Sequence, residues 1–190
     1  YTHTTLECNS KLLDLSTPAI MGILNLTDDS FHDGGKYNSI KKALKQTEKM
    51  LDEGAKIIDI GAYSSQPYAK NISLEEEWQR LEKTLQIINK KFPQAILSID
   101  TFRSEIAWRS VDNGADIIND ISAGNLDLKM FDIVADLNVP YIMMHMQGTP
   151  QTMQDNPHYD CIEKEVANFF LSKVKTLNQK GLSNIIIDPG

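Results

Sequence analysis

Six short apolar segments, each ending at a polar residue, place the strongest constraint on how this chain can fold. The segments are rich in isoleucine and bounded by glycine, proline or polar residues, a pattern typical of buried strands. They cover residues 19–24, 56–60, 95–99, 115–118, 139–144 and 184–187. Because helical segments separate them, we expect a parallel sheet whose strands are joined by right-handed helical crossovers.

The clearest predicted helix spans 73–90, where Ser73 and Glu76 have the spacing of a capping box. Apolar residues recur at intervals of three and four along it, which predicts one buried stripe. The stripe consists of Leu74, Trp78, Leu81, Leu85 and Ile88. Three glycines follow helical runs and precede strands, as expected of helix C-caps: Gly54, Gly114 and Gly181.

Three strand segments are near copies of one another, at 54–59, 114–119 and 184–188. Such an internal repeat favours a closed ring of similar units over an open, doubly wound sheet. The polar strand ends are about 33 residues apart on average, close to the roughly 31 per unit of a (β/α)8 barrel. We therefore predict an α/β fold, a (β/α)8 TIM barrel. The chain, 1–190, would be one incomplete barrel domain with six of eight units, the last two strands and helices missing.

Polar side chains end every predicted strand. They are Asn25, Asp59, Asp100, Asn119, His145 and Asp188. The carboxyl ends of barrel strands form the rim at which barrel enzymes carry out their chemistry. We expect most of the six to face one opening, and one or two to be structural, with Asp59 the first candidate and His145 the second.

Charge and composition exclude several classes of partner. The net charge is −7 and the isoelectric point about 5.1, whereas nucleic-acid binding needs a basic surface, so we expect no nucleic-acid partner. No apolar stretch is long enough to span a membrane, and residues 1–10 lack the features of a signal peptide. Two distant cysteines fit a reducing compartment, so a cytoplasmic protein is expected.

Three polar segments at the predicted rim are candidates for substrate contact. Residues 25–35 form a long loop that contains Phe31, and long loops in compact domains are commonly functional. Residues 61–69 carry the adjacent hydroxyls of Ser64 and Ser65 and a stiffening Pro67. Residues 142–150 contain three methionines, whose thioethers pack well against flat aromatic rings.

These segments together resemble the dihydropteroate synthase family. The matching motifs are Met-Gly-Ile-Leu-Asn at 21–25 with Gly-Gly at 34–35, Ile-Ile-Asp-Ile-Gly at 57–61, Ser-Ile-Asp-Thr at 98–101, Ile-Ile-Asn-Asp at 117–120, Met-His-Met-Gln-Gly-Thr-Pro at 144–150 and Asp-Pro-Gly at 188–190. They follow the family's order along nearly the whole chain, and the ordered set is far more specific than any single motif.

The resemblance implies a (β/α)8 transferase that joins 6-hydroxymethyl-7,8-dihydropterin pyrophosphate to 4-aminobenzoate, releasing pyrophosphate and forming 7,8-dihydropteroate for folate synthesis. In the family's scheme, pyrophosphate departs first and the aromatic amine captures the cationic pterin methylene. The resemblance also implies small-molecule substrates, a Mg²⁺ cofactor and a homodimer for the full-length protein.

The roles of individual residues follow from the same resemblance. Asp100, Asn119 and Asp188 would bind the donor-rich edge of the pterin, because ionised carboxylates are acceptors only. Asp100 would also stabilise the cation and is the predicted catalytic residue. Ile121 and Met144 would pack on the faces of the ring. The remaining assignments are the magnesium ligand Asn25, the amine contact Ser65, and the pocket residues Phe31 and Pro67.

Three residues depart from the family pattern in the loops that are expected to bind the diphosphate. Gln66 replaces a usual Arg, Tyr68 a usual Gly and Asp28 a usual Pro, changes that weaken the capture of a diphosphate. Lys70 or Arg103 could supply the positive charge that is lost at Gln66. The chain ends before two basic segments of the family, so we expect the 190-residue fragment alone to be inactive and to expose apolar strand and helix surface.

Other readings of the sequence remain open. A pterin-binding barrel that transfers a methyl group from methyltetrahydrofolate would share the aspartate and asparagine contacts. A catalytically silent pterin-binding module would explain Gln66 and Asp28. A purely structural barrel would leave the polar strand ends unexplained.

Overall fold

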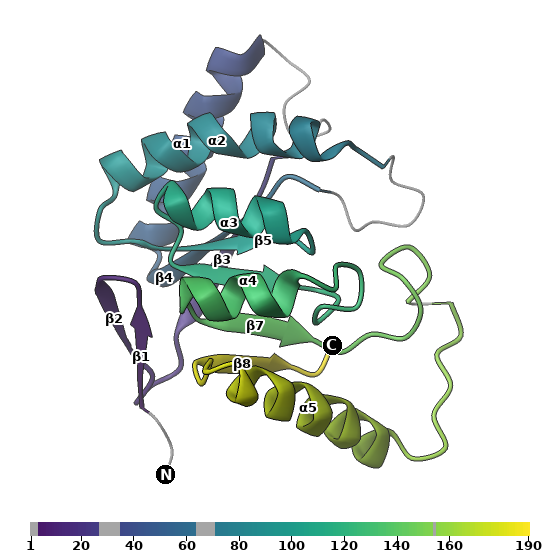
Figure 1. Ribbon diagram of the computed structural model, residues 1–190. Helices are drawn as coiled ribbons and strands as arrows, with labels where there is room; N and C mark the ends of the chain where they lie inside the picture. Colours follow the sequence, from purple (N-terminus) through teal and green to yellow (C-terminus); the bar gives the residue numbers. More distant parts are fainter. Residues whose placement is uncertain (1–3, 27–34, 64–70, 154) are drawn as a thin grey trace.

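The computed structural model describes residues 4–26, 35–63, 71–153 and 155–190 (Figure 1). Six parallel strands form one sheet in the order β3-β4-β5-β6-β7-β8, which is also their order in the sequence. Their bounds are β3 Ile20–Asn25, β4 Ala55–Gly61, β5 Ile96–Asp100, β6 Ile117–Asp120, β7 Tyr141–Met144 and β8 Ile185–Asp188. All six predicted strands are confirmed, and the sheet with its helices is a partial (β/α)8 barrel.

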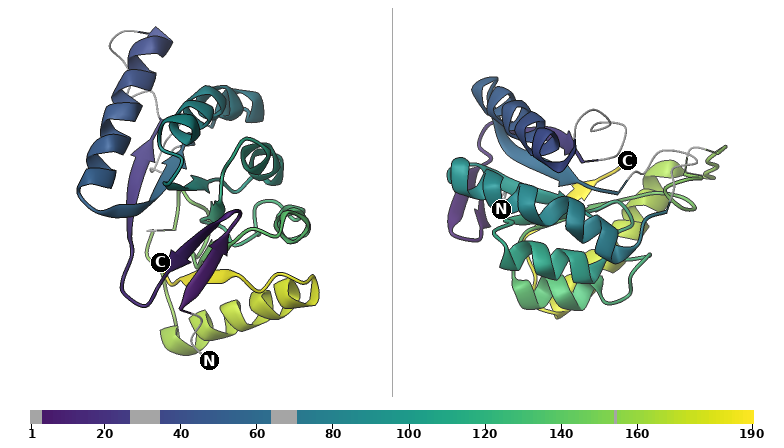
Figure 2. Two further views of the ribbon diagram at one scale, coloured as in Figure 1. Left: turned by 90° about the vertical axis from the view of Figure 1, so that its left-hand side faces the viewer. Right: turned by 90° about the horizontal axis from the view of Figure 1, so that it is seen from above.

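Helices connect the strands and cover the outer face of the curved sheet (Figure 2). They are α1 Gly35–Asp52, α2 Leu74–Lys91, α3 Ser104–Asp112, α4 Met130–Leu137 and α5 Ile162–Gln179. Among the described residues, none of these helices combines the length and the apolar character that a membrane span requires.

Local signals in the sequence explain where the helices begin and end. The Ser73 hydroxyl accepts a hydrogen bond from the Glu76 amide (3.1 Å), so α2 starts where the capping pattern predicts. The Glu76 carboxylate pairs with Arg80 (2.8 Å) and stabilises the first turn of the helix. The three predicted C-cap glycines all have positive φ angles, a conformation that glycine adopts without steric cost: Gly54 (102°), Gly114 (97°) and Gly181 (92°).

Alternate residues of each strand belong to two separate hydrophobic cores. The larger core lies between the sheet and the helices and includes fully buried strand residues such as Ile58, Leu97 and Ile118. The smaller core lies inside the curve of the sheet. It contains one isoleucine from each of five neighbouring strands: Ile57, Ile96, Ile117 and Ile142, with Ile186 packed against them. Because side chains alternate with a period of two, this division fixes which residues of each strand face the barrel interior.

An antiparallel hairpin, which the sequence analysis did not predict, closes the amino end of the inner core. Its strands are β1 Thr5–Cys8 and β2 Lys11–Asp14. In Figure 1 it lies beyond the amino ends of the parallel strands. The Lys11 ammonium donates to the carbonyl of Ala95 and the buried carboxylate of Asp116, both at 2.7 Å. Four-residue strands are too short to show a clear period-two pattern, so the hairpin could not be predicted from the sequence.

The two edge strands expose apolar side chains. On β3, Ile20 is 60% exposed and Ile23 is 65% exposed, and on β8 Ile187 is 50% exposed. Leu171 on α5 is 67% exposed. The predicted exposure of apolar strand and helix surface is thus confirmed.

A buried carboxylate holds the loop that follows β6 against the barrel rim. Asp120 accepts hydrogen bonds from the Ser122 amide and hydroxyl (both 2.7 Å), the Gly124 amide (2.8 Å) and the Tyr141 hydroxyl (2.7 Å). Tyr141 is fully buried, and its ring packs edge-on against Phe131 with centroids 5.9 Å apart. These bonds fix the loop that carries Ile121.

We expect Tyr141→Phe to lower the free energy of unfolding by about 1.5–3 kcal/mol, because it removes one hydrogen bond from a buried carboxylate and keeps the ring. Urea denaturation monitored by circular dichroism measures the change. Tyr159→Phe is the control, since the Tyr159 hydroxyl has no hydrogen-bond partner among the described residues. Equal stability of the two variants would contradict a role for Asp120 as the anchor of this loop.

Candidate functional site

The residues of the inner core continue, on the same face, into a ring of polar and apolar side chains at the carboxyl end of the strands. Each lies two or four positions after an inward-facing core residue, and an even spacing keeps it on the barrel interior. They are Asn25, Asp59, Asp100, Asn119, Met144 and Asp188. In the strand register, Asp100 lies beside Asn119, and Met144 lies beside Asp188.

Gly61 brings Asp100 and Asn25 close together. This glycine lies beside Asn25 on one side and Asp100 on the other. A Cβ atom built on Gly61 would lie 3.2 Å from Asp100 Oδ2 and 3.5 Å from Asn25 Oδ1. Both oxygens therefore lie above the same glycine, and the absence of a side chain there leaves room for them.

Asp59 orients the side chain of Asn119. The Asn119 amide nitrogen donates to Asp59 Oδ2 at 3.0 Å, so the amide oxygen of Asn119 remains available as an acceptor at the rim. Asp59 is only 5% exposed, and burial raises the pKa of its carboxyl. The hydrogen bond from Asn119 acts in the opposite direction. The expectation that Asp59 is structural agrees with this arrangement, because its contact is with another site residue.

The environment of Asp100 favours the neutral carboxylic acid. Burial raises the pKa of Asp100 to about 8. The negative charges of Asp59, Asp120 and Glu77 act in the same direction, in that order of size. A carboxyl with so high a pKa is protonated in much of the neutral range and can release its proton when a donor group approaches. Strong pKa shifts of this origin are typical of functional sites.

Two apolar side chains flank the polar ring. Ile121 and Met144 are partly exposed at the carboxyl end of the sheet, outside both hydrophobic cores. Asp188 is exposed at the end of β8, where its Oδ1 accepts a hydrogen bond from the Gly190 amide at 3.0 Å. The rim thus combines carboxylate and amide oxygens with apolar side chains, a set that suits a flat, donor-rich ring.

His145 does not join this ring. It follows the inward-facing Met144 by one position, and its side chain is buried among aromatic rings: Phe169 at 4.9 Å, Tyr159 at 5.8 Å and Phe170 at 6.4 Å between centroids. These contacts agree with the expectation that His145 is structural. On β7, Met144 lies on the inward-facing side of the strand instead.

Several predicted site residues lie outside the described part of the chain. These are the amine-pocket residues Phe31, Ser65 and Pro67, together with the departures from the family pattern at Asp28, Gln66 and Tyr68 and the suggested compensating cation Lys70. Their assignments remain expectations from the sequence.

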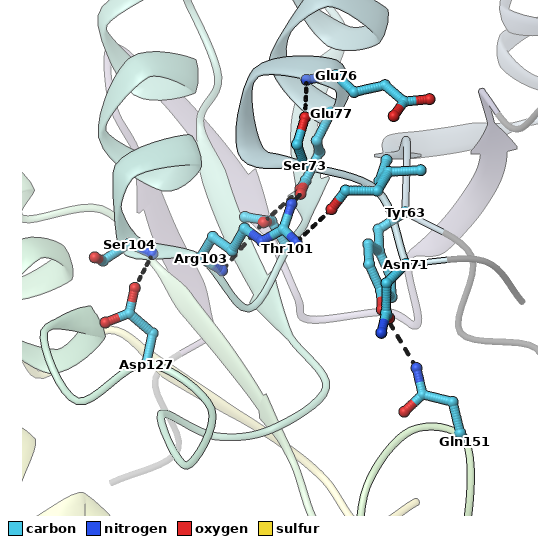
Figure 3. A network of polar contacts seen from close by, with 11 residues as sticks. Tyr63, Asn71, Ser73, Glu76, Glu77, Thr101, Arg103, Ser104, Asp127 and Gln151 are labelled. Atoms are coloured by element: carbon cyan, nitrogen blue, oxygen red, sulfur yellow. Dashed lines mark hydrogen bonds and ion pairs between the residues drawn. The ribbon is translucent and has the colours of Figure 1, made fainter.

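Arg103, the other suggested compensating cation, already forms an ion pair within the protein. Its guanidinium pairs with the fully buried Glu77 at 2.5 Å and donates to the carbonyl of Ile72 at 2.7 Å (Figure 3). Glu77 could not be predicted as this partner, because it lies in the first turn of α2 beside two other glutamates and no local signal shows that it alone would be buried. This pairing argues against Arg103 as the replacement for a lost phosphate contact.

Metal ligands at the rim are sparse. Among the described residues, no group of three or more His, Cys, Asp or Glu side chains is placed to hold an ion. The exposed side-chain oxygen of Asn25, above Gly61, is a hard donor of the type that Mg²⁺ accepts. A Mg²⁺ ion that takes few protein ligands and completes its shell with water and phosphate fits one such oxygen.

Comparison with known proteins agrees with the geometry. The family model of the pterin binding enzymes matches residues 21–190. The mitochondrial folate synthesis bifunctional protein of Pisum sativum is 48% identical over 187 residues, which cover 94% of this chain and 36% of that protein. Dihydropteroate synthase of Haemophilus influenzae is 40% identical over 187 residues, with 97% of this chain and 67% of the relative covered.

A solved structure has the same fold. Dihydropteroate synthase of Xanthomonas albilineans with 4-aminobenzoic acid superimposes with a TM-score of 0.88 at 35% identity, covering 98% of this chain and 66% of that one. The chain thus spans about a third of the plant relative and about two thirds of the bacterial proteins. By its sequence, its fold and the polar ring at its rim, the chain belongs to the pterin binding enzyme family, and its resemblance to the dihydropteroate synthases is confirmed.

Proposed function

We propose that the full-length protein is a dihydropteroate synthase. It condenses 6-hydroxymethyl-7,8-dihydropterin pyrophosphate with 4-aminobenzoate and releases pyrophosphate and 7,8-dihydropteroate. The observation that carries the proposal is the placement of Asp100 and Asn119 on adjacent strands, with the Asn119 amide held by Asp59 so that its oxygen faces the rim. The names of the related proteins and the 4-aminobenzoic acid bound by one of them support the same reaction.

The amino-pyrimidine edge of the pterin supplies N–H donors for the oxygen acceptors of this site. Asp100, Asn119 and Asp188 offer oxygen acceptors, and the amino-pyrimidine edge of the ring offers N–H donors. Ile121 and Met144 would cover the faces of the ring. Once covered by the ring, acceptors of this kind would discriminate against analogues that lack the donors, because the acceptors would then be left unpaired.

The reaction needs no protein nucleophile. The bond between the pterin methylene carbon and the pyrophosphate oxygen breaks, and its electron pair leaves with pyrophosphate. The amine nitrogen then forms a bond to that carbon and loses a proton. Asp100, ionised when the pterin is bound, lies where its negative charge would stabilise the cationic pterin, and the surrounding protein would exclude competing water.

We also propose Mg²⁺ as the cofactor, with Asn25 as its protein ligand. When bound, the ion would neutralise charge on the departing pyrophosphate. The support comes from the exposed Asn25 oxygen, which lies near Asp100 above Gly61. Ser65, Phe31 and Pro67 remain the proposed residues of the amine pocket.

A homodimer and a cytoplasmic location complete the proposal. The location rests on the free states of Cys8, which is buried, and Cys161, which is exposed. The Pisum sativum relative is named as a mitochondrial protein, so fractionation of cells with an antibody to the native protein is the direct test.

Two related functions would be separated by one assay. A silent pterin-binding barrel would bind the pterin by calorimetry and form no product at any Mg²⁺ concentration. A methyltetrahydrofolate-dependent barrel would form no pyrophosphate. Release of pyrophosphate that requires 4-aminobenzoate and Mg²⁺ supports the synthase and contradicts both alternatives.

In the full-length enzyme, we expect Asp100→Asn to lower kcat/KM by roughly 100-fold, because it removes an ionised acceptor at the reacting ring. Pyrophosphate release measures the rate. Asp112→Asn, an exposed acid at the end of α3, is the matched control and should leave the rate unchanged. A variant at Asp100 with wild-type kinetics would refute the role of this carboxylate.

The raised pKa of Asp100 predicts that pterin binding releases a proton. Free Asp100, with a pKa of about 8, is mostly protonated at pH 7, and donors from the pterin would stabilise its ionised form and lower the pKa in the complex. We expect release of nearly one proton at pH 7, little release above pH 9, and an affinity that rises with pH until the pH passes about 8.

Titration calorimetry at pH 7 in buffers of different ionisation enthalpy measures this number of protons. Asp100→Asn provides the comparison, since it should bind the pterin with no dependence on the buffer. If the wild type also showed no dependence on the buffer, Asp100 would bind the pterin without changing its protonation state.

We expect Asn25→Ala to raise the Mg²⁺ concentration required for half-maximal rate about tenfold, because the ion loses its protein oxygen. Rates measured across a Mg²⁺ titration show the shift. Asn178→Ala, an exposed position on α5, is the control. A lower maximal rate with an unchanged Mg²⁺ requirement would argue against Asn25 as the ligand.

A further inference from the structure

Asp59 is a buried acid in the barrel interior that has no direct role in the proposed reaction. It lies two residues after Ile57 on the inward face of β4, next to a layer that Ile57 forms with Ile96 and Ile117. Asp59 is 5% exposed, and its Oδ1 has no hydrogen-bond partner among the described residues. Because burying a carboxyl with an unpaired oxygen costs free energy, stability alone does not explain an acid at this position.

The other oxygen of Asp59 bonds to a side chain two strands away. Oδ2 accepts a hydrogen bond from Asn119 Nδ2 at 3.0 Å. Strand β5 lies between the two partners, with Ser98 beside Asp59 and Asp100 beside Asn119 in the strand register. The bond therefore passes across the inward face of β5 and joins the barrel interior to the rim.

The direction of this bond decides what Asn119 offers to a ligand. A side-chain amide has an oxygen acceptor at one end and an NH2 donor at the other, with nearly the same shape. Because the NH2 end is turned to Asp59, the oxygen end is available at the rim. An amide turned the other way would place its oxygen against Asp59 Oδ2 and would offer an NH2 group to the ligand.

A carboxylate suits this task because both of its oxygens are acceptors. An asparagine at position 59 has the same shape, but it could turn either its oxygen or its NH2 group to Asn119. The amide of Asn119 would then no longer be held in one orientation. The acid at position 59 is thus the feature that fixes the oxygen of Asn119 at the rim.

We propose that Asp59 is a specificity-determining residue: by accepting from Asn119, it makes the site prefer a ring with an amino group to the same ring with a carbonyl in that place. The amino group would donate to the Asn119 oxygen, whereas a carbonyl would face it acceptor to acceptor. The inference rests on the proposed synthase function, which assigns Asn119 to the pterin. Asp59 acts through Asn119 and does not touch the ring, so it is a positioning residue.

The test compares the binding of two ligands to the full-length protein by titration calorimetry. The ligands are 6-hydroxymethylpterin and 6-hydroxymethyllumazine, which carry an amino group and an oxo group, respectively, on the same ring carbon. We expect the wild type to prefer the pterin and Asp59→Asn to reduce this preference about tenfold, because one discriminating hydrogen bond is lost. A wild type without preference, an unchanged preference in Asp59→Asn, or an equal loss of affinity for both ligands would overturn the proposal.

Ser98→Ala is the matched control. Ser98 is fully buried beside Asp59, and its hydroxyl has no hydrogen-bond partner among the residues that the structure describes. The substitution changes the polarity and packing of the same layer and leaves the bond to Asn119 in place, so the preference should stay at the wild-type value. A similar loss of preference in Ser98→Ala would assign the effect to the whole layer and overturn the role of Asp59.

Exchange of the two partners provides a second test. In Asn119→Asp, two acids face each other without a donor between them, and we expect the affinity for the pterin to fall at least tenfold. In the double variant Asp59→Asn, Asn119→Asp, the amide introduced at position 59 donates to the carboxylate introduced at position 119, which still offers an oxygen at the rim. We expect this variant to recover most of the affinity and the preference for the pterin.

The exchange also decides the question if Asp59→Asn alone does not fold. A double variant that binds the pterin no better than Asn119→Asp would overturn the proposal. Failure of the proposed function has a different signature, because a wild type that does not bind the pterin removes the assignment of Asn119 on which this inference rests. A wild type that forms dihydropteroate, with the same preference in Asp59→Asn, refutes only the role of Asp59.

Discussion

The parallel register of the strands is the constraint on which the rest of this structure depends. Successive side chains of a strand point to opposite faces, and neighbouring strands are hydrogen-bonded in one register, so the alternation is shared by the whole sheet. One set of residues packs under the helices and the other lines the interior. A shift of one strand by a single residue would turn its polar end residue into the helix-facing core and destroy both the core and the site.

The site results from placing several acids where water is scarce. Asp59, Asp100 and Glu77 all have raised pKa values with burial as the largest cause, and the charges of the neighbours contribute further at Asp100. The fold compensates each acid differently. Glu77 has a cation and a hydroxyl, Asp120 has four donors, and Asp59 has the Asn119 amide. Among the residues that the structure describes, Asp100 has the least compensation, which is the condition under which a ligand with N–H donors gains most by binding there.

The amino and carboxyl ends of the barrel are held by separate sets of contacts. At the amino end, the hairpin and the bond from Lys11 to Asp116 close the inner core and contribute stability. At the carboxyl end, loops are tied to one another by polar networks around Arg103 and Asp120. The contacts that close the inner core and those that hold the rim loops thus involve different residues, an arrangement that allows the loops of a barrel to vary while its strands stay the same.

Local signals in the sequence were enough to determine the strands, the start of α2, the glycine caps and the partial barrel, because each depends on a short-range pattern of apolar, capping or glycine residues. The position of Asp100, Asn119 and Asp188 at strand ends also followed from the sequence, but the face of the strand did not, since His145 was placed at a strand end in the same way and is buried among aromatic rings. Tertiary structure alone decided which polar residues would be partners. Nothing local distinguishes Glu77 from Glu75 and Glu76, or shows that Arg103 is paired and His145 enclosed by phenylalanines. Those outcomes depend on contacts between residues far apart in the chain, whose energies no short segment contains.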